Sequence, residues 1–170
     1  MAHLAHYRQS HPALFVVTHW INLCCMGLLM ATGFYIHYPL FGGIMGPCRG
    51  LHIFCGFVVF INCLFRIIAA CFVKTAVADG TRTDLVPDIK NFLPQKLNRH
   101  QFGSWIKYYL FIKKTHPVGA KYGVPQKLAY DGVPLMIIFM FYTGMCLQKP
   151  ASDIPMFAAF TTAVGGLMIV

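Results

Sequence analysis

The sequence predicts an all-α integral membrane protein with a cytoplasmic N-terminus, three complete spanning helices and a fourth that is incomplete. Of its 170 residues, 57% are hydrophobic and only 11% are charged, whereas soluble domains carry about 25% charged residues. A spanning helix needs about 20 consecutive, mostly apolar residues, and the chain has three complete runs of this length. A basic nucleic-acid binder is excluded, because ten of the 14 lysines and arginines lie together between 74 and 127, as in the cytoplasmic loops of membrane proteins.

We interpret residues 1–170 as one domain, with spans expected at about 12–36, 51–73, 126–147 and 156–170. Pro12 suits the first helical position, where its missing N–H removes no hydrogen bond. The run from 156 to 170 lacks the length and the polar flank of a complete span. We therefore expect the sequence to stop partway through, or just before, a fourth span.

The charge pattern sets the expected orientation. The short loops at 37–50 and 148–155 hold only Arg49 and Lys149, so the basic loop at 74–125 is expected in the cytoplasm. Within that loop, residues 99–114 carry aromatic residues at helical spacing. This pattern predicts a helix that either lies at the inner membrane interface or packs on a partner subunit. The seven cysteines show no metal-ligand spacing, and we interpret them as apolar packing residues.

Two histidines lie within or at the start of apolar spans. An ionisable residue there indicates function by default, and neutral imidazole is a common metal and haem ligand. His19 is expected near the inner face and His52 near the outer face, about 25 Å apart in depth. They would therefore bind two different irons rather than one.

Three further residues accompany these histidines. Gly56 lies one turn after His52 and leaves room for a flat macrocycle, although close helix packing would explain it equally well. Arg66, near the inner end, and Arg49, before His52, are candidates to pair with haem propionates. Arg66 would alternatively only extend its charge to the membrane interface.

Several short motifs resemble the di-haem cytochrome b subunits of membrane-bound formate dehydrogenases, nickel–iron hydrogenases and thiosulfate reductases. They are THW at 18–20, RGLH at 49–52, KYGVPQKLAY at 121–130 and YTG at 142–144. The resemblance implies a four-helix transmembrane bundle with two haem b groups, in which His19 ligates the inner haem and His52 the outer one. It also implies a quinone site, for menaquinone or ubiquinone, at Tyr122, Gly123 and Gln126. The family has asparagine where this chain has Gly123, which removes a side-chain hydrogen-bonding group.

The resemblance implies a multi-pass electron-transfer subunit in a bacterial or archaeal cytoplasmic membrane, surrounded by lipid. Its partners would be an iron–sulfur subunit and a catalytic dehydrogenase, hydrogenase or reductase subunit at the outer face. The chain would not be catalytic alone, and the second axial ligands are expected beyond Val170 or on another chain. The alternative is a haem-free anchor or a channel-like, proton-relay subunit. A transporter is weaker, because no internal repeat is evident.

Overall fold

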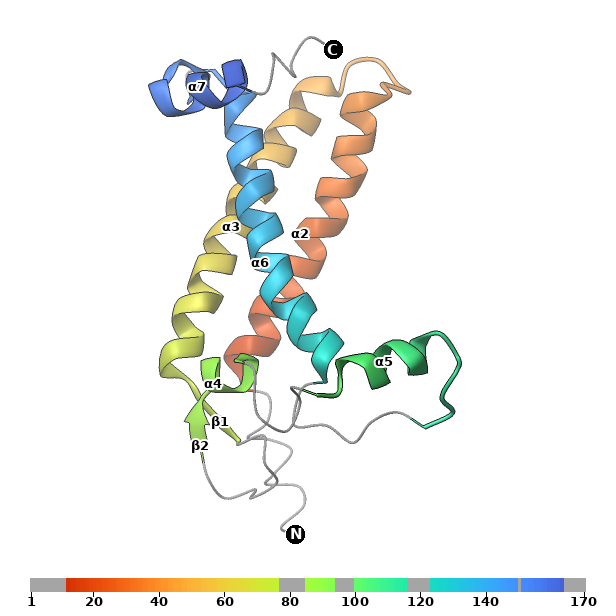
Figure 1. The fold of residues 1–170 in the computed structure, drawn as a ribbon. Coiled ribbons are helices and arrows are strands. Elements are labelled where there is room, and N and C mark those ends of the chain that lie inside the picture. Colours follow the sequence, from red (N-terminus) through yellow and green to blue (C-terminus); the bar gives the residue numbers. More distant parts are fainter. Residues whose placement is uncertain (1–11, 77–84, 94–99, 116–122, 150, 164–170) are drawn as a thin grey trace.

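Three helices of the computed structural model are long and apolar enough to cross a membrane. They are α2 (Ala13–His37), α3 (Met45–Phe72) and α6 (Val124–Cys146). The structure describes residues 12–76, 85–93, 100–115, 123–149 and 151–163. Helices α2 and α3 run antiparallel and pack along each other, and α6 packs on α3 (Figure 1). This arrangement confirms the predicted all-α membrane fold.

Helix α2 starts where the sequence expects it to. The Pro12 carbonyl accepts hydrogen bonds from the N–H groups of Phe15 and Val16, so proline stands just outside the first turn, where its own N–H is not needed. The helix ends at His37, and the Tyr35 hydroxyl donates a hydrogen bond to the Phe41 carbonyl, which holds the following turn against the helix.

Helix α3 begins six residues earlier than the expected span at 51. The loop expected at 37–50 is therefore too long, since Met45–Gly50 already belongs to the helix. Pro47 falls in the first helical turn, where a missing N–H is tolerated. As a result, Arg49 lies on the helix and not in a loop.

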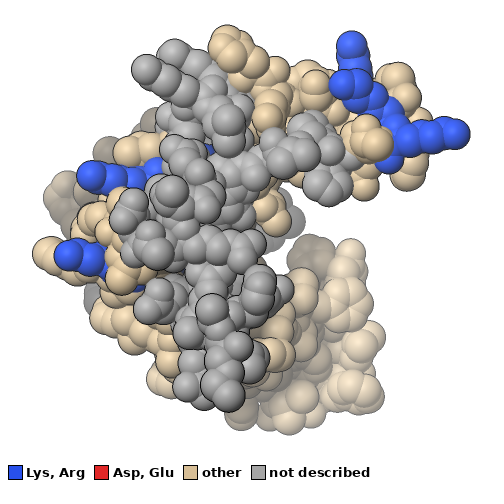
Figure 2. All heavy atoms as spheres, turned by 90° about the horizontal axis from the view of Figure 1, so that it is seen from below, with Lys and Arg blue, Asp and Glu red and all other residues tan. Residues whose placement is uncertain are grey.

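The segment between α3 and α6 has structure of its own. β1 (Lys74–Ala76) and β2 (Leu85–Pro87) form an antiparallel ribbon in which Thr75 faces Val86. The short helix α4 (Ile89–Phe92) follows directly. These elements lie at the end of the bundle where α2 begins (Figure 1). Seen from that end, lysine and arginine side chains lie on both sides of the molecule (Figure 2).

Helix α5 (Phe102–Tyr109) is shorter than the helix expected over 99–114. It ends before Phe111, whose φ of 60° lies in the left-handed region and breaks the helix. The Trp105 indole packs against Gly123, where a Cβ would lie 2.9 Å from the ring. The aromatic residues Phe102 and Tyr109 are exposed in this chain. Both expected roles, membrane contact and partner contact, remain predictions.

Helix α6 begins directly after Gly123, whose N–H donates a hydrogen bond to Gln126 Oε1 at 2.9 Å. It continues through Pro134 to Cys146. Beyond it lie a 3₁₀ turn, η1 (Ala151–Asp153), and helix α7 (Pro155–Ala163). Cys146, Ala151 and Phe157 form a small apolar cluster where α7 meets α6. The rest of the expected fourth span, at 164–170, falls outside the described residues, so this span remains a prediction.

A pair of asparagines joins α2 to α3 within the bundle. Asn62 Nδ2 donates hydrogen bonds to the Thr18 carbonyl at 2.8 Å and to Asn22 Oδ1 at 2.7 Å. Lipid chains are as apolar as leucine side chains, so helix association in a membrane relies on packing and on hydrogen bonds of this kind. The two asparagines therefore fix the register of α2 against α3.

Replacing Asn62 with Leu should weaken the contact between α2 and α3. We expect a double-mutant cycle with Asn22→Ala to give a coupling of about 0.6–1.7 kcal/mol, the range of interhelical hydrogen bonds in membranes. Unfolding in mixed micelles measures it. Asn62→Leu should cost more than Asn22→Ala, because Asn62 also donates to a backbone carbonyl. If the destabilisations of the two single variants simply add in the double variant, the two amides stabilise the contact between α2 and α3 independently.

Candidate functional site

His52 lies in the second turn of α3 and faces α2. Its Nδ1 is 2.9 Å from Thr32 Oγ1, and its ring is half-buried. The same Thr32 oxygen lies 2.6 Å from the Leu28 carbonyl of its own helix. Gly33, the next residue, lies beside the ring, because a Cβ there would be 3.3 Å from His52 Cε1. His52, the predicted outer ligand, is therefore held by specific contacts with two residues of α2.

His19 has a different setting on α2. Its neighbour Thr18 is buried against α3, while the His19 side chain is exposed. The nearest ring contact is edge-on with Trp20, at 6.2 Å between ring centres. Among the described residues, the His19 imidazole has no hydrogen-bond partner. The inner candidate thus lies to one side of the contact between α2 and α3 and is accessible to a ligand.

The two histidines are well separated along the bundle. His52 is level with Thr32, which lies 13 residues after His19 on the same helix (32 minus 19). At 1.5 Å of rise per residue, this spacing is about 20 Å. The separation of about 25 Å expected from the sequence is therefore somewhat too large. Because α3 starts at Met45, before the expected span, His52 lies level with Thr32 and not with the end of α2. One metal ion cannot contact both side chains.

Arg49 and Gly56 flank His52 on α3. Arg49 lies about one turn before it, and its side chain is exposed. Gly56 lies about one turn after it, and a Cβ there would meet nothing within 4 Å. Close helix packing against this glycine is therefore not observed in the part of the chain that the structure describes. The surface beside His52 is open at Gly56, as a flat macrocycle would require.

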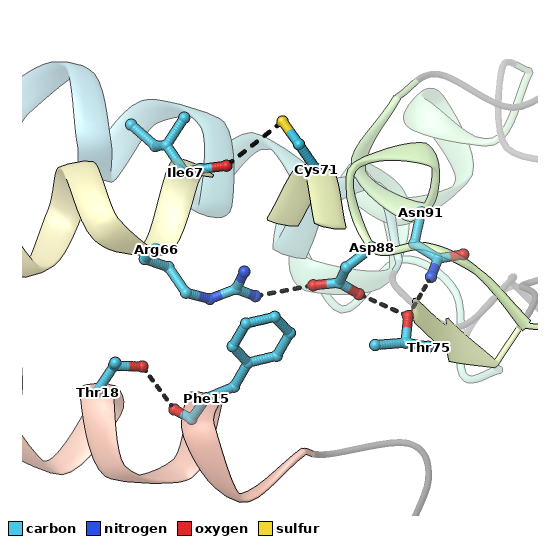
Figure 3. A network of polar contacts seen from close by, with 8 residues as sticks. All are labelled: Phe15, Thr18, Arg66, Ile67, Cys71, Thr75, Asp88 and Asn91. Atoms are coloured by element: carbon cyan, nitrogen blue, oxygen red, sulfur yellow. Dashed lines mark hydrogen bonds and ion pairs between the residues drawn. The ribbon is translucent and has the colours of Figure 1, made fainter. Parts of the chain in front are cut away.

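Arg66 makes an ion pair that could not be predicted from the sequence. Its guanidinium donates to Asp88 Oδ2 at 2.9 Å and lies 3.6 Å from the centre of the Phe15 ring (Figure 3). The contact with Phe15 is a cation–π interaction between α3 and the first turn of α2. Arg66 therefore does more than extend to the membrane interface. It joins both helices to the segment that follows β2.

The polar network continues from Asp88 into the ribbon. Thr75 Oγ1 donates to Asp88 Oδ1 at 2.8 Å, and Asn91 Nδ2 donates to Thr75 Oγ1 at 2.8 Å (Figure 3). These three residues are almost fully buried. Burying a carboxylate requires a charge partner and hydrogen bonds, and Arg66 and Thr75 supply both. The sequence offered one signal, Asp88, which is the only acidic residue between Leu85 and Phe92.

The expected quinone positions are only partly described. Gly123 is buried beneath Trp105, and Gln126 is exposed with its Oε1 engaged at the start of α6. Lys127 is buried, and its ammonium group donates to the Leu93 carbonyl at 3.1 Å. Tyr122 and Lys121 lie outside the described residues. The start of α6 thus combines a buried cation with an exposed amide at the end of the bundle near His19.

Comparison with known sequences identifies the class of protein that this fold and these histidines define. The sequence profile described as prokaryotic cytochrome b561 matches residues 10–169. The chain belongs to this family, and membership implies a membrane b-type cytochrome that carries haem b for electron transfer. With three apolar helices, it is a multi-pass protein of a prokaryotic cytoplasmic membrane.

Two curated relatives are similar over most of the chain. Both are described as a probable Ni/Fe-hydrogenase 1 B-type cytochrome subunit, one from Escherichia coli strain K12 and one from Escherichia coli O157:H7. Each is 29% identical over 171 residues, which covers 95% of this chain and 68% of the relative. No solved structure matches the sequence. These relatives confirm the predicted link to the cytochrome b subunits of hydrogenases.

Replacing Asp88 with Asn should destabilise the end of the bundle where α2 begins. The change leaves Arg66 without its charge partner, and breaking a buried pair costs about 3–5 kcal/mol. Because the Arg66 side chain is 26% exposed, we expect about 2–3 kcal/mol, at or below the lower limit of that range. Thermal unfolding in detergent measures the change, with Asp153→Asn in the exposed part of η1 as the control. Equal stability of both variants would contradict a structural role for this ion pair.

Proposed function

We propose that this protein is the membrane electron-transfer subunit of a hydrogenase and carries two b-type haems. His19 ligates an inner haem and His52 an outer haem. The observation that carries the proposal is the placement of these histidines on two antiparallel spanning helices, about 20 Å apart along the bundle. Membership of a cytochrome b family supplies the cofactor class.

The side chains around each histidine fit such a group. His52 keeps Nε2 for an iron while its Nδ1 is engaged by Thr32. Arg49, about one turn away and exposed, would neutralise a propionate carboxylate of the outer haem. Gly56 leaves space for the macrocycle. A bound haem would supply one-electron redox chemistry, and the protein sets its ligation, burial and nearby charge.

The inner site uses Arg66 in a more limited way. One terminal nitrogen of the guanidinium is held by Asp88, but a guanidinium carries five N–H donors. A propionate of the inner haem would therefore share Arg66 with Asp88. The exposed side chain of His19 leaves the imidazole accessible to iron.

The proposed electron path runs across the membrane. The curated relatives are described as hydrogenase cytochrome subunits, so the catalytic partner proposed here is a hydrogenase, with an iron–sulfur subunit at the outer face. Electrons would pass from the outer haem to the inner haem and then to menaquinone or ubiquinone near Tyr122, Gly123 and Gln126. Helix α5 contains Lys107 and is followed by Lys113 and Lys114. The basic end of the bundle, seen in Figure 2, would face the cytoplasm.

Replacing His19 or His52 with Ala should each remove one haem. Purified wild-type complex is expected to give two b haems per copy by reduced-minus-oxidised spectrum and pyridine haemochrome. His19→Ala should lose the inner haem and keep the outer one, and His52→Ala should do the reverse. His100→Ala is the matched control, because His100 is exposed and lies outside the spans.

Two outcomes would contradict this assignment. Wild-type complex without haem would make the chain a haem-free anchor, with the histidines as packing or relay groups. Retention of both haem spectra in His19→Ala or His52→Ala would place the ligands elsewhere in a protein that still carries haem.

Replacing Gln126 with Ala should weaken quinone interaction at the inner haem. The change removes one exposed amide, and a hydrogen bond is worth about 0.5–1.5 kcal/mol, or roughly a 2- to 13-fold change in affinity. The measurement is the rate of inner-haem reduction by a quinol analogue as its concentration is varied. Gln148→Ala, at the opposite end of α6, is the control. An unchanged concentration dependence in Gln126→Ala would remove this residue from the quinone site.

A further inference from the structure

The environment of His52 contains two residues of α2 that neither the motifs nor the family assignment distinguishes. Thr32 Oγ1 contacts Nδ1 of the imidazole, and Gly33 lies against Cε1. We propose that Thr32 and Gly33 are positioning residues for His52, which hold its ring in the orientation and tautomer that an iron ligand needs. This inference rests on the proposed role of His52 as a haem ligand.

The hydrogen-bond geometry determines the tautomer. A threonine hydroxyl has one proton to donate, and at 2.6 Å the Leu28 carbonyl is the nearest acceptor to Thr32 Oγ1. The Leu29 carbonyl is farther away, at 3.3 Å. Back-donation of this kind to the preceding turn is a common use of threonine within helices. The oxygen then accepts from His52, so the proton lies on Nδ1 and Nε2 keeps its lone pair for the iron.

Burial makes this contact matter. Thr32 is only 6% exposed, so water does not compete effectively for its oxygen. A ligating histidine binds the metal through one ring nitrogen and carries a proton on the other. A group that accepts a hydrogen bond from this N–H fixes the ring orientation and raises the basicity of the ligand. A more basic imidazole favours the ferric form and lowers the reduction potential. Thr32 is therefore expected to keep the potential of the outer haem lower than it would otherwise be.

Gly33 acts by leaving room for the His52 ring and not by a hydrogen bond. A Cβ at this position would lie 3.3 Å from His52 Cε1, closer than most side-chain contacts allow. The ring would have to shift by a few tenths of an ångström away from α2. Gly27, on the same helix, has nothing within 4 Å of the position of a Cβ and provides a direct comparison.

The test compares variants that change the contacts of the His52 imidazole with control variants that leave these contacts intact. Thr32→Val removes the acceptor while keeping the shape of the side chain, and Thr32→Ser keeps the oxygen. Thr18→Val is the matched control, because Thr18 lies on the same helix, is equally 6% exposed and bonds to the Phe15 carbonyl rather than to a histidine. The readouts are potentiometric titration of both haems in the intact complex and the electron paramagnetic resonance spectrum of the oxidised haems. The outer haem is identified as the one lost in His52→Ala.

In Thr32→Val we expect both haems to be present, with the outer-haem potential shifted to a more positive value and its resonance positions changed. The inner haem should be unaffected, and Thr32→Ser should resemble wild type. Thr18→Val should leave the outer haem unchanged. Gly33→Ala should shift or lose the outer-haem signal, while Gly27→Ala should not.

Outer-haem potential and resonance positions identical to wild type in Thr32→Val would overturn the inference for Thr32, and an unchanged outer haem in Gly33→Ala would overturn it for Gly33. In either case the proposed function would stand, because both haems would still be present. Absence of haem from wild type, or survival of both haems in His52→Ala, would instead refute the proposed function itself.

Discussion

The polar contacts between α2 and α3 are the interaction on which the rest of the structure depends. A bilayer offers little hydrophobic force to bring apolar helices together, so polar side chains and close packing must fix their relation. Here such contacts occur at three depths: Arg66 over Phe15, Asn62 with Asn22, and His52 with Thr32. Together they set the angle and the register of the pair. The position of each candidate ligand follows from that register.

The two candidate ligands are held in unlike ways by the same helix pair. His52 points into the contact between the helices, where a hydroxyl and a glycine of α2 shape its surroundings. His19 lies on an outward-facing part of α2, next to Trp20. The protein thus determines the orientation of one imidazole within this pair of helices. The surroundings of the His19 imidazole must come from other elements of the bundle.

The spanning helices could be predicted from the sequence, because apolar length alone identifies them. The orientation that the basic residues indicate stays a prediction. The position of His19 along α2 required only that the helix start directly after Pro12. The partner of His52 could not be predicted, since it depends on where α3 begins, and the residues Gly46, Pro47 and Gly50 read as a loop. The Arg66–Asp88 pair was equally hidden, because a ribbon and a short helix bring these residues together. Asn22 and Asn62, two amides within apolar runs, are a signal in the sequence for the contact between α2 and α3.

The salt bridge between Arg66 and Asp88 also bears on how the chain keeps its orientation in the membrane. Arg66 is synthesised before its partner, which lies 22 residues later. A lone arginine near a helix end is tolerated while it reaches the membrane surface. Once Asp88 pairs with it, the end of α3 is tied to the segment that carries β2 and α4. Inverting α3 would then carry Asp88, together with β2 and α4, through the hydrocarbon, and the cost of moving these polar groups opposes the inversion.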